Sequence, residues 1–402
     1  MPTLNFSLIS DDAARIEAIS RIIREFTRKS NQNVQSQILS WKDAWQQILD
    51  FSLRGDTPDV SHIGSTWSST LSAMNALRPF TRDEIDDFGG IDAFFQTVWA
   101  STHTNIDPTI WAIPWSTFTF ILVYRRDLIA KAGVDETRAF DTAKDMDNTF
   151  AALQAVGVKN PWAIETSSTW DLIHIAASWV WGAGGNYMSA DGTKVLVHTP
   201  KTLAGLSDFF ALVRYLSPQT RFLSAQQCLD LFRQGQCAAT VIAADNVRSL
   251  LDSEYSTPEV RSNLGTAALP GSPWVGGDNL VIWKNTRVHQ KQTQAALDLV
   301  RYLSSKDTQI NLYNSTGILP TRVDAFNQLS LDPPGLKPTL ARVFNRGQVH
   351  PANKLWGRVE TELRETFEVV LGDLLGDSSL EVRAVLDKYF LPLGRRLERI
   401  LG

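Results

Sequence analysis

Strand-like and helix-like patterns alternate along the N-terminal part of the chain, and this order constrains the fold more than any other feature. Residues 4–8 alternate apolar and polar side chains as a strand does, and residues 10–12 can cap the helix that follows. Residues 34–39 and 59–63 predict two more strands, with a second helical stripe between them. Strands that alternate with helices favour parallel pairing, so we expect an α/β fold.

The remainder of the chain continues this mixture of strands and helices. With 402 residues, 43% of them hydrophobic, the chain can form two well-packed lobes. No convincing strand pattern appears in the last quarter, where helical patterns take over. Three later strand regions and two long C-terminal helices are predicted at residues 111–124, 237–243, 277–283, 356–371 and 380–401.

The thirteen tryptophans are the feature that points most directly to function. Trp67, Trp115, Trp170 and Trp274 all lie in short segments of polar, Gly or Pro residues. An indole ring has a flat apolar face and a donor on its edge, which suits sugar rings with C–H patches on their faces and hydroxyls around the rim. The pattern favours carbohydrate binding, with core filling as the alternative for any single ring. Three tryptophans in apolar runs are assigned to the core: Trp179, Trp181 and Trp283.

Charge and cysteine content bear on the class of partner. The net charge is −4 with a pI of about 5.9, and no basic stripe appears, so nucleic acid is not an expected partner. No Cys/His cluster has the spacing of a metal site, and neither a metal nor a cofactor is expected. Cys228 and Cys237 flank a predicted turn between a helix and a strand, where a disulfide and two buried thiols are equally compatible with the sequence.

The sequence leaves the compartment open. No apolar run is long enough to cross a bilayer. Residues 1–6 begin directly as a strand and lack the charged and apolar regions of a secretory signal. Either the protein is cytosolic or a signal has been removed, and a disulfide would favour an oxidising compartment.

Short motifs follow one another in a fixed order over nearly the whole chain. They read Gly-x-x-Pro-Asp-Val, Leu-x-Pro-Phe, Tyr-x-x-Asp-Leu followed by Ala-Gly-Val, Phe-x-x-Gly-x-x-Ala and Thr-Gly-x-x-Pro, at residues 55–60, 77–80, 124–134, 232–238 and 316–320. In this order they resemble the extracellular solute-binding proteins of family 1, the carbohydrate-binding receptors of ABC importers, which look like maltose-binding protein. Residues 142–146 and 243–245 depart from the family pattern, so one stacking ring is missing or is supplied by another tryptophan.

The resemblance implies a two-lobe periplasmic-binding-protein fold, type II-like, each lobe a mostly parallel sheet flanked by helices, with extra C-terminal helices. It places residues 1–115 and 265–318 in an N-terminal lobe and residues 116–264 and 319–402 in a C-terminal lobe, with hinge crossings near 115, 265 and 318. Ligand would bind in the cleft between the lobes, beyond the carboxyl ends of strands.

The resemblance also implies how such a protein works. Hinge closure around the ligand would present the complex to the membrane permease subunits of an ABC importer. The protein would be a monomer without catalytic activity, exported to the periplasm or to the outer face of the cytoplasmic membrane, with or without a lipid anchor.

Candidate ligand residues follow the strands of both lobes. Planar side chains that carry two polar atoms can pair with adjacent sugar hydroxyls, and glycines let backbone amides approach a ligand closely. The candidates are Asp12, Trp41, Thr66, Trp67, Trp115 and Ser116 in the first lobe and hinge, and Glu165, Trp170, Asp245, Asn246, Trp274, Gly276, Gly277, Asp278 and Trp356 thereafter. The alternative role of Asp12, Asp245 and Asn246 is to cap the helix that follows each of them.

Two other classes of function compete with a sugar receptor. A glycoside hydrolase needs two carboxyl groups across a glycosidic bond, which Glu165, Asp245 and Asp278 could supply, but no sequence signature supports it. A receptor for an anion or a metal predicts clustered Tyr and His ligands, whereas the chain has seven Tyr and six scattered His. The leading hypothesis is a receptor for a disaccharide, a short oligosaccharide or a glycosylated compatible solute.

Overall fold

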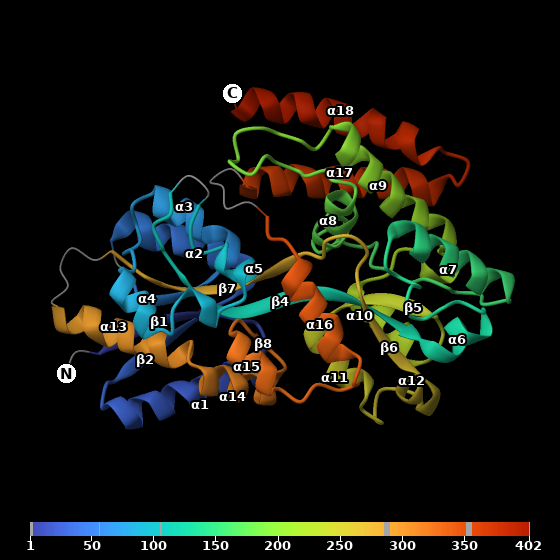
Figure 1. Cartoon of the computed structure of the whole chain (residues 1–402). Helices are drawn as coiled ribbons and strands as arrows, with labels where there is room; N and C mark the ends of the chain where they lie inside the picture. Colours follow the sequence, from blue (N-terminus) through green and yellow to red (C-terminus); the bar gives the residue numbers. More distant parts are fainter. Residues whose placement is uncertain (1–2, 56, 105–106, 285–289, 351–355, 402) are drawn as a thin grey trace. The chain divides into compact units, whose positions relative to one another are not determined.

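The chain forms two compact units, each built from strands and helices, which confirms the predicted α/β class. The computed structural model describes residues 3–55, 57–104, 107–284, 290–350 and 356–401 (Figure 1). Unit 1 comprises Met1–Phe118, Gly276–Ser330 and Val349–Lys354, and unit 2 comprises Thr119–Val275, Leu331–Gln348 and Leu355–Gly402.

The first passage between the units, at residues 118–119, lies close to the hinge crossing expected near 115, whereas the next two, at residues 275–276 and 330–331, differ from those expected near 265 and 318. Strand β6 (Leu264–Ala268) pairs along its whole length with β4 inside unit 2, so the chain leaves this unit only at β7 (Val275–Ile282). Strand β8 (Leu319–Pro320) pairs with β4 inside unit 1, and this unit therefore keeps the chain to residue 330. The pairing of β6 and β8 with β4 sets these two unit boundaries, and the sequence motifs do not show which strands pair.

The sheet of unit 1 has the order β2-β1-β3-β7-β4, with β8 beside the first part of β4 (Ile113–Arg125). Strand β1 pairs in parallel with β2 and β3, as the alternation of strands and helices predicted, whereas β7 runs antiparallel to β3. The sheet is therefore mixed rather than mostly parallel, because β7 does not enter it through a strand–helix–strand crossover. The three parallel strands are β1 (Leu4–Ile9), β2 (Val34–Leu39) and β3 (Val60–Gly64).

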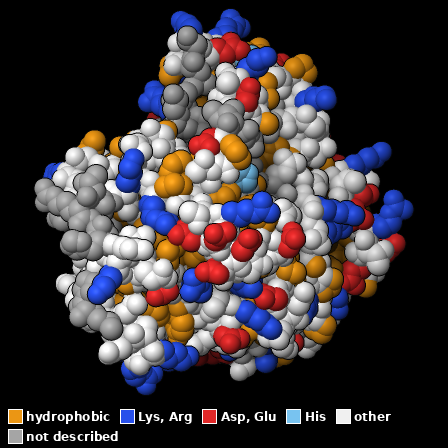
Figure 2. All heavy atoms as spheres, turned by 60° about the vertical axis from the view of Figure 1, so that its left-hand side comes forward, with side chains coloured by type: hydrophobic (Ala, Val, Ile, Leu, Met, Phe, Trp, Pro, Cys, Tyr) orange, Lys and Arg blue, Asp and Glu red, His pale blue; other side chains and the backbone are white. Residues whose placement is uncertain are grey.

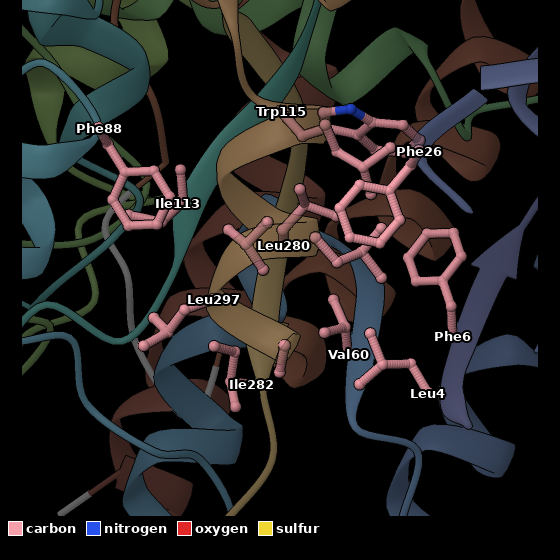
Figure 3. Packing of buried hydrophobic residues seen from close by; sticks show 14 of the residues in the cluster. Leu4, Phe6, Phe26, Val60, Phe88, Ile113, Trp115, Leu280, Ile282 and Leu297 are labelled. Carbon is pink, nitrogen blue, oxygen red and sulfur yellow. The ribbon is translucent and has the colours of Figure 1, made fainter. Parts of the chain in front are cut away.

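Helices cover both faces of this sheet. On one face Phe6, Val60 and Leu280 meet Phe26 of α1 in the cluster shown in Figure 3. Successive strand residues point to opposite faces, so the neighbouring Val281 packs on the other side against α2 and α3. The helices of this unit are α1 (Ala13–Ser30), α2 (Trp41–Arg54), α3 (Ser68–Ala73), α4 (Arg82–Asp87), α5 (Gln96–Trp99), α13 (Gln290–Leu303), α14 (Lys306–Thr316) and α15 (Val323–Gln328).

In unit 2 the second part of β4 lies between β5 (Ala239–Ala243) and β6 and pairs antiparallel with both. The expected mostly parallel sheet is therefore not seen here; one parallel bridge joins Ala163 to Thr240 beside β5. The helices are α6 (Arg126–Lys131), α7 (Ala143–Ala155), α8 (Leu172–Gly182), α9 (Pro200–Ala211), α10 (Ala225–Arg233), α11 (Val247–Leu250), α12 (Pro258–Ser262), α16 (Leu336–Arg346), α17 (Trp356–Gly376) and α18 (Val382–Leu401).

The two predicted C-terminal helices are present as α17 and α18, and they pack with α8 and α9 into a helical layer of unit 2 (Figure 1). Phe367 of α17 contacts the rings of Phe210 in α9 and Phe390 in α18, at centroid distances of 5.1 and 6.0 Å. Helices α8 and α9 approach so closely that a Cβ on Gly205 would lie 2.5 Å from the Cα of Val180. One candidate ligand residue, Trp356, is the first residue of α17 in this layer.

The two cysteines and the surface add further findings. Cys228 and Cys237 are buried free thiols rather than a disulfide, and burial raises the pKa of both, to about 12 for Cys228. On the face drawn in Figure 2, acidic and basic side chains are interspersed. Within the described parts of the chain, no group of three or more His, Cys, Asp or Glu side chains is placed to hold a metal ion. No described helix combines the length and the apolar character needed to cross a membrane.

Candidate ligand-binding site

A continuous line of aromatic rings lies at the carboxyl ends of the parallel strands of unit 1. Trp41 is the first residue of α2, Trp67 ends the short turn after β3, and Trp115 lies near the start of β4. Ring centroids are 5.0 Å apart for Trp45 and Trp67, 5.8 Å for Trp67 and Trp41, 5.9 Å for Trp41 and His62, and 4.9 Å for His62 and Trp115. The structure thus brings three of the predicted tryptophans together.

These rings differ in how much of their surface a ligand could reach. Trp41 is 43% exposed and Trp67 is half-buried, so both present ring surface to solvent. Trp115 is buried in the core cluster of unit 1, yet its Nε1 has no hydrogen-bond partner among the residues that the structure describes. A buried donor without a partner is uncommon in folded proteins. Trp41 and Trp67 therefore have ring surface that a ligand could reach, whereas Trp115 is packed in the core.

Asp278 and Ser116 meet beside these rings although they are far apart in the sequence. The Ser116 hydroxyl donates to Asp278 Oδ2 at 2.7 Å, and His62 Nε2 lies 3.2 Å from the same oxygen. His62 was not among the predicted site residues. Its signal in the sequence is a histidine in the middle of a short predicted strand, because buried polar groups in strands require partners.

The remaining candidates of unit 1 are engaged in the fold. Asp12 is the N-cap of α1, where its carboxylate accepts from the backbone N–H groups of Ala14 and Arg15 at 2.8 and 3.1 Å. Thr66 is half-buried in the turn after β3. Its backbone carbonyl accepts from the Ser69 hydroxyl.

Gly276 and Gly277, whose backbone amides were expected to approach a ligand, both belong to strand β7, which begins two residues before the strand predicted at 277–283. Gly277 has φ +143°, and a Cβ there would lie 2.1 Å from the carbonyl oxygen of Ser116. The close approach of β4 explains this glycine, since any side chain would collide with the neighbouring strand.

Unit 2 contains a cavity of about 140 Å³ at the carboxyl end of β5. The predicted residues Glu165 and Asn246 both line it, together with Asp171, which the sequence analysis missed. The other walls are mostly apolar and come from Phe120, Ile164, Ile175, Leu229, Val241 and Ile242. Asp245 is half-buried in the short turn that leads from β5 into α11.

The pKa values of both acidic groups of this cavity are raised above their ordinary values. Burial, and then the charge of Asp171, raises the pKa of Glu165 from 4.5 to about 7. Burial also raises the pKa of Asp171, and His174 partly opposes that shift. Glu165 Oε1 accepts from the backbone N–H of Ala225 at 3.3 Å, at the N-terminus of α10. The cavity can therefore offer both a carboxyl donor and carboxylate acceptors near neutral pH.

The raised pKa of Glu165 predicts that the stability of the protein depends on pH, and that replacing Glu165 abolishes this dependence. The unfolded carboxyl ionises near pH 4.5, whereas the folded one keeps its proton until about pH 7. The unfolding free energy should therefore fall as pH rises through this window, by on the order of 1 kcal/mol because the half-exposed carboxyl is screened. Urea titrations at several pH values should give a flatter profile for Glu165→Gln. The exposed Glu254→Gln serves as the control, and equal slopes in all three proteins would contradict this environment.

Aromatic rings flank this cavity in unit 2. Trp274 stacks on His174 and on Phe120, with centroid distances of 4.3 and 5.8 Å and interplanar angles of 17° and 26°. Trp170 is 56% exposed, and the guanidinium of Arg364 lies 3.6 Å from its ring centroid. One face of Trp170 is thus covered by Arg364, a residue that the sequence analysis missed.

One side of helix α17 faces these rings. Glu360 lies 3.3 Å from His174 Nε2, and Arg364 stacks on Trp170 one turn further along. Trp356, at the start of the helix, is only 2% exposed. It was expected to close over a sugar, but no open ring face is present at this position; the role of Trp356 in this structure is packing.

Comparison with known proteins identifies the family. Residues 21–334 match the family model described as bacterial extracellular solute-binding protein. The sn-glycerol-3-phosphate-binding periplasmic protein UgpB of Brucella melitensis is 21% identical over 297 residues, which are 67% of this chain and 64% of the relative, so the match spans less than two thirds of that protein. The diacetylchitobiose binding protein DasA of Streptomyces coelicolor is 20% identical over 359 residues, covering 85% and 78%.

Solved structures show the same fold. The sugar-binding protein MalE from Xanthomonas citri aligns with 100% of this chain and 97% of its own, with a TM-score of 0.83 at 21% identity. The family model covers well over half of the chain, and the two units match the architecture of this structure throughout. The chain belongs to the family of bacterial extracellular solute-binding proteins.

Proposed function

We propose that this protein is the substrate-binding component of an ABC importer and that its ligand is a sugar: a disaccharide, a short oligosaccharide or a glycosylated compatible solute. The observation that carries the proposal is the row of rings at the strand ends of unit 1, with Trp41 and Trp67 partly open and Asp278 beside them. Rings that stack on sugar faces and carboxylates that accept from hydroxyls are what a sugar ligand requires.

The second unit supports the same class of ligand. Glu165, Asp171 and Asn246 line a mostly apolar cavity. Trp170, the residue before Asp171 in the sequence, has an exposed ring. Apolar walls with a few convergent polar groups are typical of small-molecule sites. The proposal includes hinge closure, delivery to membrane permease subunits and action as a monomer in the periplasm or at the outer face of the cytoplasmic membrane, without catalysis.

The charges of the candidate residues argue against a phosphate ligand, although several relatives are named for binding sn-glycerol-3-phosphate. Phosphate is commonly held by bidentate arginines, by lysines or by helix N-termini. The candidate residues found here include the carboxyl groups of Glu165, Asp171 and Asp278, against one arginine, Arg364. We therefore expect neutral sugars to be preferred.

Thermal unfolding against a ligand panel tests this function. The panel contains maltose, cellobiose, trehalose, N,N′-diacetylchitobiose, glucosylglycerol and sn-glycerol-3-phosphate. A sugar present at a hundredfold over its dissociation constant should stabilise the protein by roughly 2.7 kcal/mol and change the tryptophan emission. The phosphate should produce neither effect. A response to the phosphate alone would contradict the proposal, and loss of a bound sugar to hydrolysis products on prolonged incubation would favour a glycosidase.

A further inference from the structure

Each ring nitrogen of His62 lies close to a polar group, although the side chain is only 4% exposed in the middle of β3. The parallel pairing between β1 and β3 ends at Ser7 and Ser61. Two residues further along β1, the backbone N–H of Ile9 donates to His62 Nδ1 at 3.1 Å. A backbone N–H can only donate, so Nδ1 carries no proton and the ring proton of the neutral histidine is on Nε2.

The protonated nitrogen faces Asp278. His62 Nε2 lies 3.2 Å from Asp278 Oδ2, close enough for attraction between the N–H dipole and the carboxylate, although the two groups are not aligned as a full hydrogen bond. The Ser116 hydroxyl donates to the same oxygen at 2.7 Å. Among the described residues none donates to Oδ1, and the carboxylate is 25% exposed. The protein therefore holds one oxygen of this partly exposed carboxylate, while the other has no donor among the described residues.

The same imidazole also sets the positions of two tryptophans. Its ring meets Trp115 at a centroid distance of 4.9 Å and an interplanar angle of 75°, and Trp41 at 5.9 Å and 87°. Both are edge-to-face contacts, which favour one ring orientation over others. His62 thus touches the open tryptophan, the buried tryptophan and the carboxylate of the candidate site.

We propose that His62 is a positioning residue of the ligand site: its Nε2–H orients Asp278 so that Oδ1 accepts from a ligand hydroxyl, while its ring fixes Trp41. The inference rests on the proposed function, because it assigns His62 a role in recognising the same ligand. Its chemistry requires a ligand with a hydroxyl or another donor group that reaches Asp278 while an apolar face lies on Trp41.

Two substitutions separate this role from a purely structural one. His62→Asn keeps an acceptor near the position of Nδ1 for the Ile9 amide but cannot reach Asp278. His62→Gln places an amide N–H near the position of Nε2 but leaves the Ile9 amide without its acceptor. Both variants lose the aromatic contacts equally, so the difference between them reports the two polar contacts. The binding probe is whichever of maltose, cellobiose, trehalose or N,N′-diacetylchitobiose binds the wild type most tightly.

We expect His62→Asn to weaken binding of that sugar by about tenfold in titration calorimetry. The urea concentration at which half of His62→Asn is unfolded should be equal to or higher than that of His62→Gln. His62→Gln should bind within about threefold of the wild type. The affinity losses of His62→Asn and Asp278→Asn should not add in the double variant, because both remove the same oriented carboxylate. Wild-type affinity in His62→Asn, or additive losses, would overturn the positioning role.

An NMR measurement decides the inference without a ligand. The imidazole nitrogen shifts of His62 should show the proton on Nε2, and Asp278→Asn should move that resonance. A proton on Nδ1 would overturn the proposal even if a sugar binds. Conversely, if no sugar of the panel binds the wild type, the proposed function fails while the imidazole spectrum still reports whether His62 orients Asp278.

Discussion

Replacing Asp278 by asparagine is expected to weaken sugar binding by about 10- to 150-fold. The carboxylate accepts from Ser116 and faces His62 on Oδ2, so we expect Oδ1 to accept from a ligand hydroxyl in a fixed direction. Hydrogen bonds to a charged acceptor contribute roughly 1.5–3 kcal/mol, which sets the size of the expected loss. Titration calorimetry with the best sugar of the panel measures it directly.

The matched control is Asp12→Asn, the same chemical change just after strand β1. Asp12 caps helix α1 through two backbone N–H groups, and asparagine is an equally good N-cap, so neither stability nor affinity should change much. Asp12 was a candidate ligand residue in the sequence, and this control tests it too. Equal loss in both variants would place Asp12 in the site, whereas no loss in Asp278→Asn would remove Asp278 from it.

The parts of the site that the sequence predicted are those that local rules determine. Trp41 follows strand β2 and Trp67 follows strand β3, while Asp278 pairs with Gly64 at the end of β3, and in α/β proteins strand ends converge on ligand sites. The sequence places a residue near a strand end, but it does not show whether the side chain remains free. Asp12 is used as a helix cap and Gly277 makes room for Ser116, and both roles are local structural demands that mimic a ligand-site signal.

The residues that were missed depend on contacts between distant segments. His62 approaches Asp278 only because β3 pairs antiparallel with β7, and motif order does not reveal that pairing. Arg364 reaches Trp170 because α17 packs against α8. Asp171 and Glu165 line the same cavity together with residues that are distant from them in the sequence. Two unit boundaries differ from the expected hinge crossings for the same reason, since the sequence does not show that the segments of β6 and β8 pair with β4.

The helix that carries Arg364 is held in place by its apolar side, and this predicts the largest effect on stability. Phe367 is completely buried and bridges Phe210 and Phe390, which lie in α9 and α18. Phe367→Ala should lower the unfolding free energy by about 3–5 kcal/mol, because truncating a buried phenylalanine loses its transfer free energy and leaves a cavity between three helices. Unfolding in urea, followed by circular dichroism, measures this loss.

The control for that loss lies two residues further along the same helix. Val369 is 44% exposed, so Val369→Ala removes little buried surface and replaces a β-branched residue by the best helix former. The unfolding free energy of Val369→Ala should therefore differ from that of the wild type by less than about 0.5 kcal/mol.

Arg364 and Glu360 reach their partners from α17, so Phe367→Ala should also weaken sugar binding where the protein remains folded. If folded Phe367→Ala binds sugar as tightly as the wild type, the Arg364 side of this helix takes no part in recognition. If Phe367→Ala and Val369→Ala are equally stable, the packing of α17 against α9 and α18 is contradicted.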